Sequence, residues 1–336
     1  MTKEQTNTLL SLIQKEFPIV KKPFLEIANK LGVSEDKVLA ELKKLKQNSV
    51  IRQISPIYDT KKMGYESSLV AFVVDEKNID KAVEILNSHP GISHNYERNH
   101  RFNIWFTIAV PPDSSLGLEK SVELLAKLSD AKEFNILPTI KTFKIHVKLD
   151  TSGKASKKEE VKKKTLVSYE LKDEDYPIIE KSQYDLELVS EPFRKIVDEL
   201  DITYDGFFEK LQTFKDAGIM RRFSAILNHR KAGFSANAMV AWDVDENLAD
   251  EMGKKAASFS AVSHCYLRPK YPNWKYNLFT MVHGKTTDET NSIIDEIASE
   301  ILYHDRISLY STREFKKQRV IYWTNDIYKW EKKYIY

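Results

Sequence analysis

The chain has 336 residues, of which 42% are hydrophobic and 30% are charged, so it is long and apolar enough for two ordinary domains with buried cores. Lys and Arg total 52 against 49 acidic residues, and the net charge of +3 means that any attraction for polyanions must come from local patches. Its one cysteine, Cys265, excludes an intrachain disulfide and a cysteine-rich metal site, and the polar amino terminus without a long apolar run predicts a cytoplasmic protein with no membrane partner.

Residues 1–55 are predicted to form a helix-turn-helix. Three helical stretches are expected within residues 3–47, and Ser34 is placed to cap the third of them. The apolar residues of that third stretch recur at helical spacing, as Val38, Leu42 and Leu45.

Residues 56–150 are predicted to form a ferredoxin-like domain. Strand-like runs and helical stretches follow one another in the order βαββαβ, with helices near residues 78–88 and 117–128 and a last strand-like run over residues 133–149. A four-stranded antiparallel sheet covered by two helices buries such a set economically.

The rest of the chain repeats this plan after a connector. Residues 151–175 have few large apolar side chains and mixed charge, which is typical of a linker. A second helix-turn-helix is expected over 176–224, with Gly218 placed to end its last helix, and a second ferredoxin-like domain over 225–323. Residues 324–336 form an aromatic tail.

The two halves also match in sequence. VIRQISPIYDTKKMGYESSLVAFVVDEKN around Arg52 aligns with IMRRFSAILNHRKAGFSANAMVAWDVDEN around Arg221, and the register then holds through His94 and His264 with one inserted residue. We therefore predict an α+β fold made by tandem duplication of a winged helix-turn-helix followed by a ferredoxin-like domain.

A Ser-His-x-Tyr-x-Arg motif occurs once in each half, in SHNYERNH (93–100) and SHCYLRPKY (263–271). Residues two apart on a strand leave the same face, so each motif presents a row of polar side chains. The first row is His94, Tyr96, Arg98 and His100, and the second is His264, Tyr266, Arg268 and Lys270. A face with these groups is a poor core surface and a good floor for an anionic ligand, although solvated polar residues on an open sheet face are the common alternative.

Two further clusters favour a ligand. Basic groups gather after the second helix-turn-helix, at Arg221, Arg222 and His229, and PNWKYNLFTMVHG follows the second motif with Trp274, Tyr276 and His283. Large aromatic rings beside cations suit a flat, conjugated ligand with several charges. Trp105 and Phe279, in contrast, are expected in the core.

These segments resemble the sirohaem (siroheme) decarboxylases, which have the architecture of the Lrp/AsnC regulators. VIRQISPIYDTKKMGYESSLVAF and SHNYERNHRFNIWFTIAVPP are similar to the first subunit type, and IMRRFSAILNHRKAGF, SHCYLRPKYPNWKYNLFTMVHG and STREFKKQR to the second. The resemblance covers nearly the whole chain outside the connector and the tail. It implies that both subunit types are fused in one polypeptide, as in proteins of haem d1 biosynthesis.

The resemblance implies a carboxy-lyase that removes CO2 from two acetate side chains of sirohaem to give 12,18-didecarboxysirohaem, with no cofactor beyond the iron of the substrate. His264 and His94 would be the proton donors, with Tyr266 and Tyr96 beside them. The retained carboxylates would be bound by cationic groups, namely Arg268, Arg98, Arg221, Arg222 and Lys270. The aromatic contacts would be Trp274 and Tyr276, and the axial ligand of the iron is left open among His100, His229 and His283. The second half has more of these candidate residues, so it is the preferred site.

A DNA-binding regulator that senses a tetrapyrrole or an amino acid is the main alternative. The expected recognition helices begin with acidic groups, Glu35 and Asp36 in one and Asp205 in the other, so no nucleic-acid partner is expected. A haem carrier without turnover is a third class. The two halves are expected to pair with each other within the chain, and a homodimer is left open.

Overall fold

The computed structural model describes residues 1–145, 166–227 and 236–335, and the chain forms two compact units. The first, called the helical unit, comprises Met1–Tyr65, Lys164–Lys231 and Ile321–Thr324. The second, called the sheet unit, comprises Glu66–Lys163, Ala232–Val320 and Asn325–Tyr336. Each unit therefore takes segments from both halves of the duplicated sequence.

The first helix-turn-helix has three helices, as the sequence predicts. They are α1 (Lys3–Lys15), α2 (Pro23–Leu31) and α3 (Glu35–Gln47). Thr2 and Gln5 form a capping box at the start of α1, and Gly32 ends α2 in the left-handed conformation. Ser34 is the N-cap residue of α3, but its side chain makes no capping hydrogen bond.

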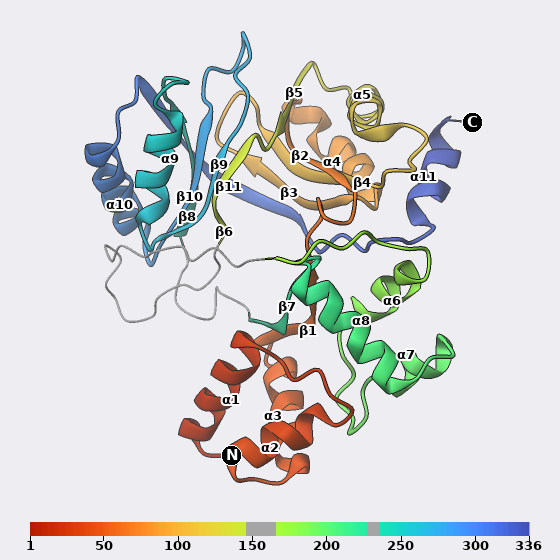
Figure 1. Cartoon of the computed structure of the whole chain (residues 1–336). Coiled ribbons are helices and arrows are strands. Elements are labelled where there is room, and N and C mark those ends of the chain that lie inside the picture. Colours follow the sequence, from red (N-terminus) through yellow and green to blue (C-terminus); the bar gives the residue numbers. More distant parts are fainter. Residues whose placement is uncertain (146–165, 228–235, 336) are drawn as a thin grey trace. The chain divides into compact units, whose positions relative to one another are not determined.

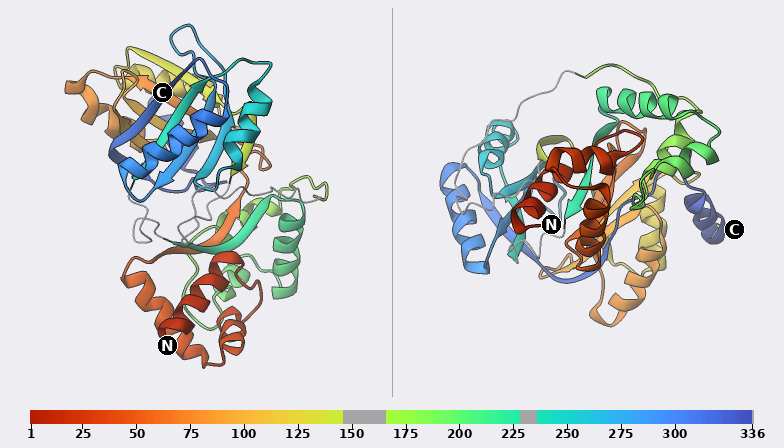
Figure 2. Two further views of the ribbon diagram at one scale, coloured as in Figure 1. Left: turned by 90° about the vertical axis from the view of Figure 1, so that its left-hand side faces the viewer. Right: turned by 90° about the horizontal axis from the view of Figure 1, so that it is seen from below.

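The second half contributes α6 (Asp175–Ser182), α7 (Arg194–Glu199) and α8 (Tyr204–Asp216) to the helical unit. Gly218 follows α8 with a φ of 70°, a conformation that glycine adopts readily, and ends the helix as expected. One strand from each half then completes the unit. Strands β1 (Ile51–Tyr58) and β7 (Met220–Leu227) pair antiparallel and form a two-stranded sheet (Figure 2).

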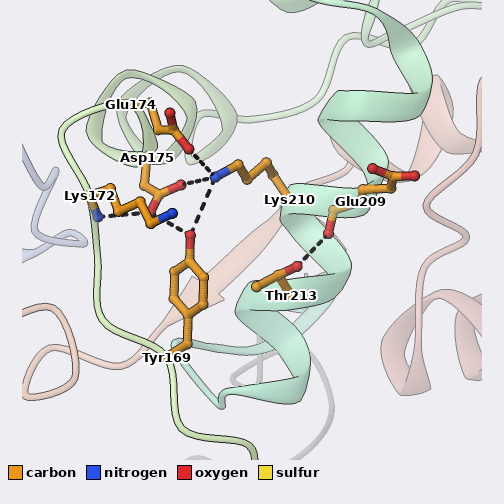
Figure 3. A network of polar contacts seen from close by, with 7 residues as sticks. All are labelled: Tyr169, Lys172, Glu174, Asp175, Glu209, Lys210 and Thr213. Carbon is orange, nitrogen blue, oxygen red and sulfur yellow. Dashed lines mark hydrogen bonds and ion pairs between the residues drawn. The ribbon is translucent and has the colours of Figure 1, made fainter.

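A buried carboxylate attaches the segment before α6 to α8 (Figure 3). Asp175 is fully buried, and it accepts hydrogen bonds from the Lys210 ammonium at 2.9 Å, from the Tyr169 hydroxyl at 2.8 Å and from the Lys172 backbone at 2.9 Å. Burial opposes the charge on Lys210, but the hydrogen bonds to Glu174 and Asp175 outweigh it and raise the pKa of that ammonium group. The network satisfies a carboxylate that would otherwise be costly to bury.

The first half of the sheet unit has the predicted βαββαβ order. It runs β2 (Glu66–Val73), the short 3-10 helix η1 (Glu76–Asn78), α4 (Ile79–Ser88), β3 (Ile92–Arg98), β4 (Ile104–Val110), α5 (Gly117–Leu128) and β5 (Glu133–Pro138). The strands lie in the spatial order β5-β2-β4-β3, which is the ferredoxin-like order. Helices α4 and α5 cover one face of this half-sheet, over a core that includes Phe72, Phe106 and Leu125 (Figure 1).

The second half repeats this arrangement. It runs β8 (Ala236–Asp243), α9 (Ala249–Ser258), β9 (Val262–Leu267), β10 (Leu278–Gly284), α10 (Thr287–Glu300) and β11 (Asp305–Lys317). The strand order is β11-β8-β10-β9, with α9 and α10 covering one face over Trp242, Met252 and Ile294 (Figure 1). The matched topology follows from the matched pattern of apolar residues.

The two half-sheets exchange strands. The first half continues from β5 into β6 (Lys141–Ile145), which pairs with β9 of the second half. In return, β11 pairs with β8 along its first part and with β3 of the first half along its second part. The two halves therefore join in a nine-stranded sheet, β5-β2-β4-β3-β11-β8-β10-β9-β6.

The arginine of each motif bonds to a strand of the opposite half. Arg98 on β3 donates to the carbonyl of Leu309 on β11 at 2.7 Å, and Arg268, just after β9, donates to the carbonyl of Leu137 on β5. Both side chains are buried, and burial lowers the pKa of each to about 10. This placement differs from the ligand-facing one predicted from sequence, because the guanidinium groups serve the contact between the halves.

A core between the half-sheets closes the sheet unit. It is formed by the sheet faces that the helices leave uncovered, and its largest members are Phe102, Trp105, Trp274 and Phe279. Trp105 and Phe279 were expected in a core. Trp274 was expected at the ligand, but it is 2% exposed and packs edge-on against Phe102 and Trp105, because its loop folds back between the half-sheets.

The aromatic tail forms helix α11 (Asp326–Ile335), which packs on the first half of the sheet unit (Figure 1). Its Trp330 lies edge-on to His89, with ring centroids 4.5 Å apart. Burial, together with the charge of Lys316, lowers the pKa of His89 to about 3. Among the described residues, no helix has the length and apolar character that crossing a bilayer requires.

We expect Arg268→Met to lower the free energy of unfolding by about 1–3 kcal/mol, because the Leu137 carbonyl loses a buried charged donor. Arg98→Met should have a similar effect through Leu309. The matched control is Arg101→Met, which removes an exposed ion pair with Glu133 and should cost less than about 1 kcal/mol. Urea denaturation monitored by tryptophan fluorescence measures all three, and equal losses for Arg101 and Arg268 would contradict the proposed role in holding the halves together.

We expect His89→Phe to reduce the acid sensitivity of the fold. The folded pKa of His89 is about 3 against 6.5 for the free side chain, so the unfolded chain binds more protons between these values. His89 therefore costs stability as pH falls below about 6.5, by at most about 1.4 kcal/mol per pH unit. Phe259 holds the equivalent position after α9, which makes phenylalanine a natural replacement. Urea midpoints between pH 4 and 7 test this, and an unchanged slope in the variant would assign the acid loss to other groups.

Candidate functional site

The two Ser-His-x-Tyr-x-Arg motifs lie on β3 and β9, and each places its His, Tyr and Arg in a row. The rings of His94 and Tyr96 have centroids 6.2 Å apart, and those of His264 and Tyr266 6.0 Å apart. The motif arginine then lies over its tyrosine ring, at 5.6 Å for Arg98 and 5.0 Å for Arg268. These contacts follow from the two-residue spacing on a strand.

The serine that precedes each histidine holds the imidazole. Ser263 lies 2.8 Å from Nδ1 of His264 and 2.7 Å from Nε2 of His283 on β10, so its hydroxyl joins two imidazoles. In the first half, Ser93 lies 3.0 Å from Nδ1 of His94 and 2.7 Å from the hydroxyl of Thr107. Sequence reasoning gave these serines no role, although their position before each histidine was a signal for one.

The exchanged strands border both motifs. On β6 of the first half, Ile145 pairs with His264 and Thr142 with Tyr266. On β11 of the second half, Lys317 pairs with His94 and Glu314 with Tyr96. Lys317 and Glu314 lie 3.6 Å from each other. Charged residues therefore pair with the His and Tyr of the first motif, and uncharged residues pair with those of the second.

Lys270 and Tyr276 follow the second motif and bind acidic residues. The ammonium group of Lys270 lies 2.5 Å from Asp243, and the hydroxyl of Tyr276 donates to Asp305 at 2.8 Å. Burial and the contact with Asp305 raise the pKa of Tyr276 to about 12. Sequence reasoning missed both carboxylates, because they belong to β8 and β11 and come close only in the folded sheet.

His100 lies against the core between the half-sheets. Its Nδ1 accepts a hydrogen bond from the Phe102 backbone at 3.0 Å, and its ring stands edge-on to Trp274 with centroids 5.5 Å apart. Burial, with the nearby charge of Arg101, lowers its pKa. A neutral imidazole is the form that can ligate a metal ion.

Arg221 and Arg222 belong to the helical unit, whereas both motifs belong to the sheet unit. On β7, Arg221 makes an ion pair with Asp59 at 2.8 Å. Burial, with the charge of Arg221, lowers the pKa of Arg222. His229 lies outside the described residues.

The described residues contain no group of three or more His, Cys, Asp or Glu side chains that could hold a metal ion. What the motifs offer instead is a single imidazole beside a phenol in the first half and a pair of imidazoles beside a phenol in the second. Such groups can exchange protons with a ligand and accept hydrogen bonds from it.

Known protein families match most of the chain. Residues 62–144 and 231–316 match the AsnC-like ligand binding domain, and residues 7–52 match the siroheme decarboxylase NirDL-like HTH domain. A siroheme decarboxylase of Hydrogenobacter thermophilus is 41% identical over 327 residues, which is 97% of each chain. A siroheme decarboxylase beta subunit of Methanosarcina barkeri is 36% identical over 146 residues, 44% of this chain and 96% of the subunit.

Solved structures agree with this assignment. The crystal structure of the siroheme decarboxylase NirDL in co-complex with an iron-uroporphyrin III analogue has a TM-score of 0.79 to this structure and 35% identity, and the alignment covers 98% of each chain. The duplicated AsnC-like domains confirm the predicted fold. The chain therefore belongs to the sirohaem decarboxylase family, with two AsnC-like domains fused in one polypeptide.

Proposed function

We propose that this protein is a carboxy-lyase that removes CO2 from two acetate side chains of sirohaem, giving 12,18-didecarboxysirohaem. The observation that carries the proposal is the pair of histidine–tyrosine rows on β3 and β9, each bordered by a strand of the other half. The relative solved with an iron-uroporphyrin III analogue supports a large, carboxylate-rich tetrapyrrole as the ligand.

The chemistry needs a proton donor at a defined carbon. Loss of CO2 leaves the bonding electron pair on the former methylene carbon, which must then take up a proton. His264 and His94 are the proposed donors, and the rings of Tyr266 and Tyr96 beside them would orient the reacting acetate groups. The proposal requires no group beyond the substrate and its own iron.

Cationic groups would bind the carboxylates that are kept. Lys270 is the proposed contact beside the second motif, although it must be shared with Asp243. Arg221 and Arg222 stay candidates on the helical unit. The iron ligand stays a prediction among His100, His229 and His283. Burial lowers the pKa of His100, which favours the neutral imidazole that ligation requires.

The regulator alternative finds little support in the helical unit. The helices expected to read DNA begin with acidic residues, Glu35 and Asp36 in α3 and Asp205 in α8. Glu35 also accepts hydrogen bonds from Ser190, at 3.0 and 3.1 Å. Carboxylates at this position oppose the approach of a phosphate backbone.

We expect the purified protein, incubated with sirohaem under anaerobic conditions, to release CO2 twice, as seen by mass spectrometry of the tetrapyrrole. His264→Ala and His94→Ala should each slow one of the two losses by about 100-fold or more, because a positioned general acid contributes about 100- to 10,000-fold. His304→Ala is the matched control, because this exposed histidine is paired with Asp245 and belongs to neither motif.

Bound but unchanged sirohaem in the wild-type protein would contradict the decarboxylase and leave a sensor or a carrier. Binding to duplex DNA that weakens steeply with salt would then support the regulator. If only one histidine variant is impaired in both losses, a single half carries out the chemistry.

A further inference from the structure

Ser263 joins two imidazoles that belong to different strands. Its hydroxyl lies 2.8 Å from Nδ1 of His264 on β9 and 2.7 Å from Nε2 of His283 on β10. Ser263 itself is only 3% exposed, so bulk water does not compete for this hydroxyl. A hydroxyl donates one hydrogen bond and accepts others, so it can take a proton from one ring while it gives its own to the other.

We propose that Ser263 relays a proton from His283 to His264 during decarboxylation, which makes Ser263 a positioning residue for the function proposed above. In this step the bond between the methylene carbon and the carboxylate breaks, CO2 leaves, and the electron pair stays on carbon. His264 gives its Nε2 proton to that carbon, Ser263 gives its proton to Nδ1 of His264, and protonated His283 gives its Nε2 proton to Ser263. The carbon gains one proton, and His283 loses one positive charge. An imidazolium cannot ligate iron, so this role for His283 leaves His100 and His229 as the candidate iron ligands.

The relay explains how His264 can act as an acid without becoming an anion. A neutral imidazole that gave up its only proton would form an unstable imidazolate. Because Ser263 faces Nδ1, that nitrogen gains a proton as Nε2 loses one. The ring therefore stays neutral throughout, and the charge change takes place at His283, one hydroxyl further from the substrate.

The first half has no histidine at the position equivalent to His283. Ser93 contacts Nδ1 of His94 at 3.0 Å in the same way, but its second contact is the hydroxyl of Thr107 at 2.7 Å. Ala109 holds the position of His283, since the Ala109 amide donates to Gly91 on the first half as the His283 amide donates to Ala261 on the second. Neither Thr107 nor Ala109 titrates near neutral pH, so the two half-sites differ in how they supply protons.

Other charged and titratable groups among the described residues lie on the strands around the relay. Tyr266 lies beside His264 on the same strand, with ring centroids 6.0 Å apart. On β6, Lys144 is buried and its ammonium group donates to the Phe259 carbonyl at 2.8 Å. Cys265 lies in the helix-covered core, where burial raises its pKa. His264 pairs with Met281 of β10, and the methionine side chain has no ionisable group.

The test uses the full chain with sirohaem under anaerobic conditions, with each CO2 loss followed separately by mass spectrometry and binding followed by absorption titration. Five variants are compared: Ser263→Ala, Ser263→Thr, His283→Gln, Ser93→Ala and the double variant Ser263→Ala/His283→Gln. Threonine keeps the hydroxyl. Glutamine keeps a hydrogen-bonding nitrogen near Ser263 but cannot deliver a proton at neutral pH.

We expect Ser263→Ala and His283→Gln each to slow one of the two CO2 losses at least tenfold, with binding changed less than threefold. Ser263→Thr should recover most of the rate, and Ser93→Ala should have a smaller effect than Ser263→Ala. The double variant Ser263→Ala/His283→Gln should be no slower than either single one, because both changes interrupt the same transfer. We plot the rate of the slowed CO2 loss against pH. His283→Gln should remove from this profile the part that reports the protonation of His283.

A near-normal rate for His283→Gln would overturn the relay and leave Ser263 as a hydrogen-bonding group only. Loss of sirohaem binding in Ser263→Ala would overturn it as well, in favour of a binding role. If Ser263→Ala does not fold, the rates of CO2 loss in His283→Gln and Ser263→Thr decide whether the relay holds. A wild-type protein that releases no CO2 would instead refute the proposed function, and the relay with it, so the two failures are distinct.

Discussion

The exchange of β6 and β11 between the half-sheets is the constraint on which the rest of the sheet unit depends. Each half supplies the strand that borders the other half's motif, so neither candidate site is complete without the other half. The buried guanidinium groups of Arg98 and Arg268 reinforce the exchange through carbonyls of the opposite half. Fusion in one chain keeps the two halves at a high effective concentration and in a fixed ratio.

This use of the arginines decides what chemistry remains for the motifs. Three groups alternate along each motif strand, and the last is committed to the contact between the halves. The histidine and tyrosine are then the motif groups that we propose contact the ligand. On the proposed function, the cations for an anionic substrate would then come from the exchanged strands or from the segments that follow the motifs, where Lys270 faces Asp243.

Duplication also shows where the halves have diverged. His89 and Phe259 hold equivalent positions after α4 and α9, and the buried histidine accompanies the docking of α11 on its half. Lys317 and Ile145 hold equivalent positions beside the motif histidines, and His283 stands where the first half has Ala109. Two of these differences lie beside the motif histidines while the strand order is kept, as expected when a fold is retained and its sites specialise.

The duplication, the order of helices and strands and the common face of His, Tyr and Arg could all be predicted from the sequence, because local periodicity and residue spacing encode them. Three features could not be predicted: β6 and β11 pair with strands of the opposite half, Arg268 and Trp274 are buried, and Ser263 contacts His283. These contacts join residues from different strands, and in several cases from different halves, so no local pattern contains them. A local pattern allows a strand several possible neighbours, and pairing between distant segments fixes which one it has. That pairing therefore decides which polar residues are buried and which can face a ligand.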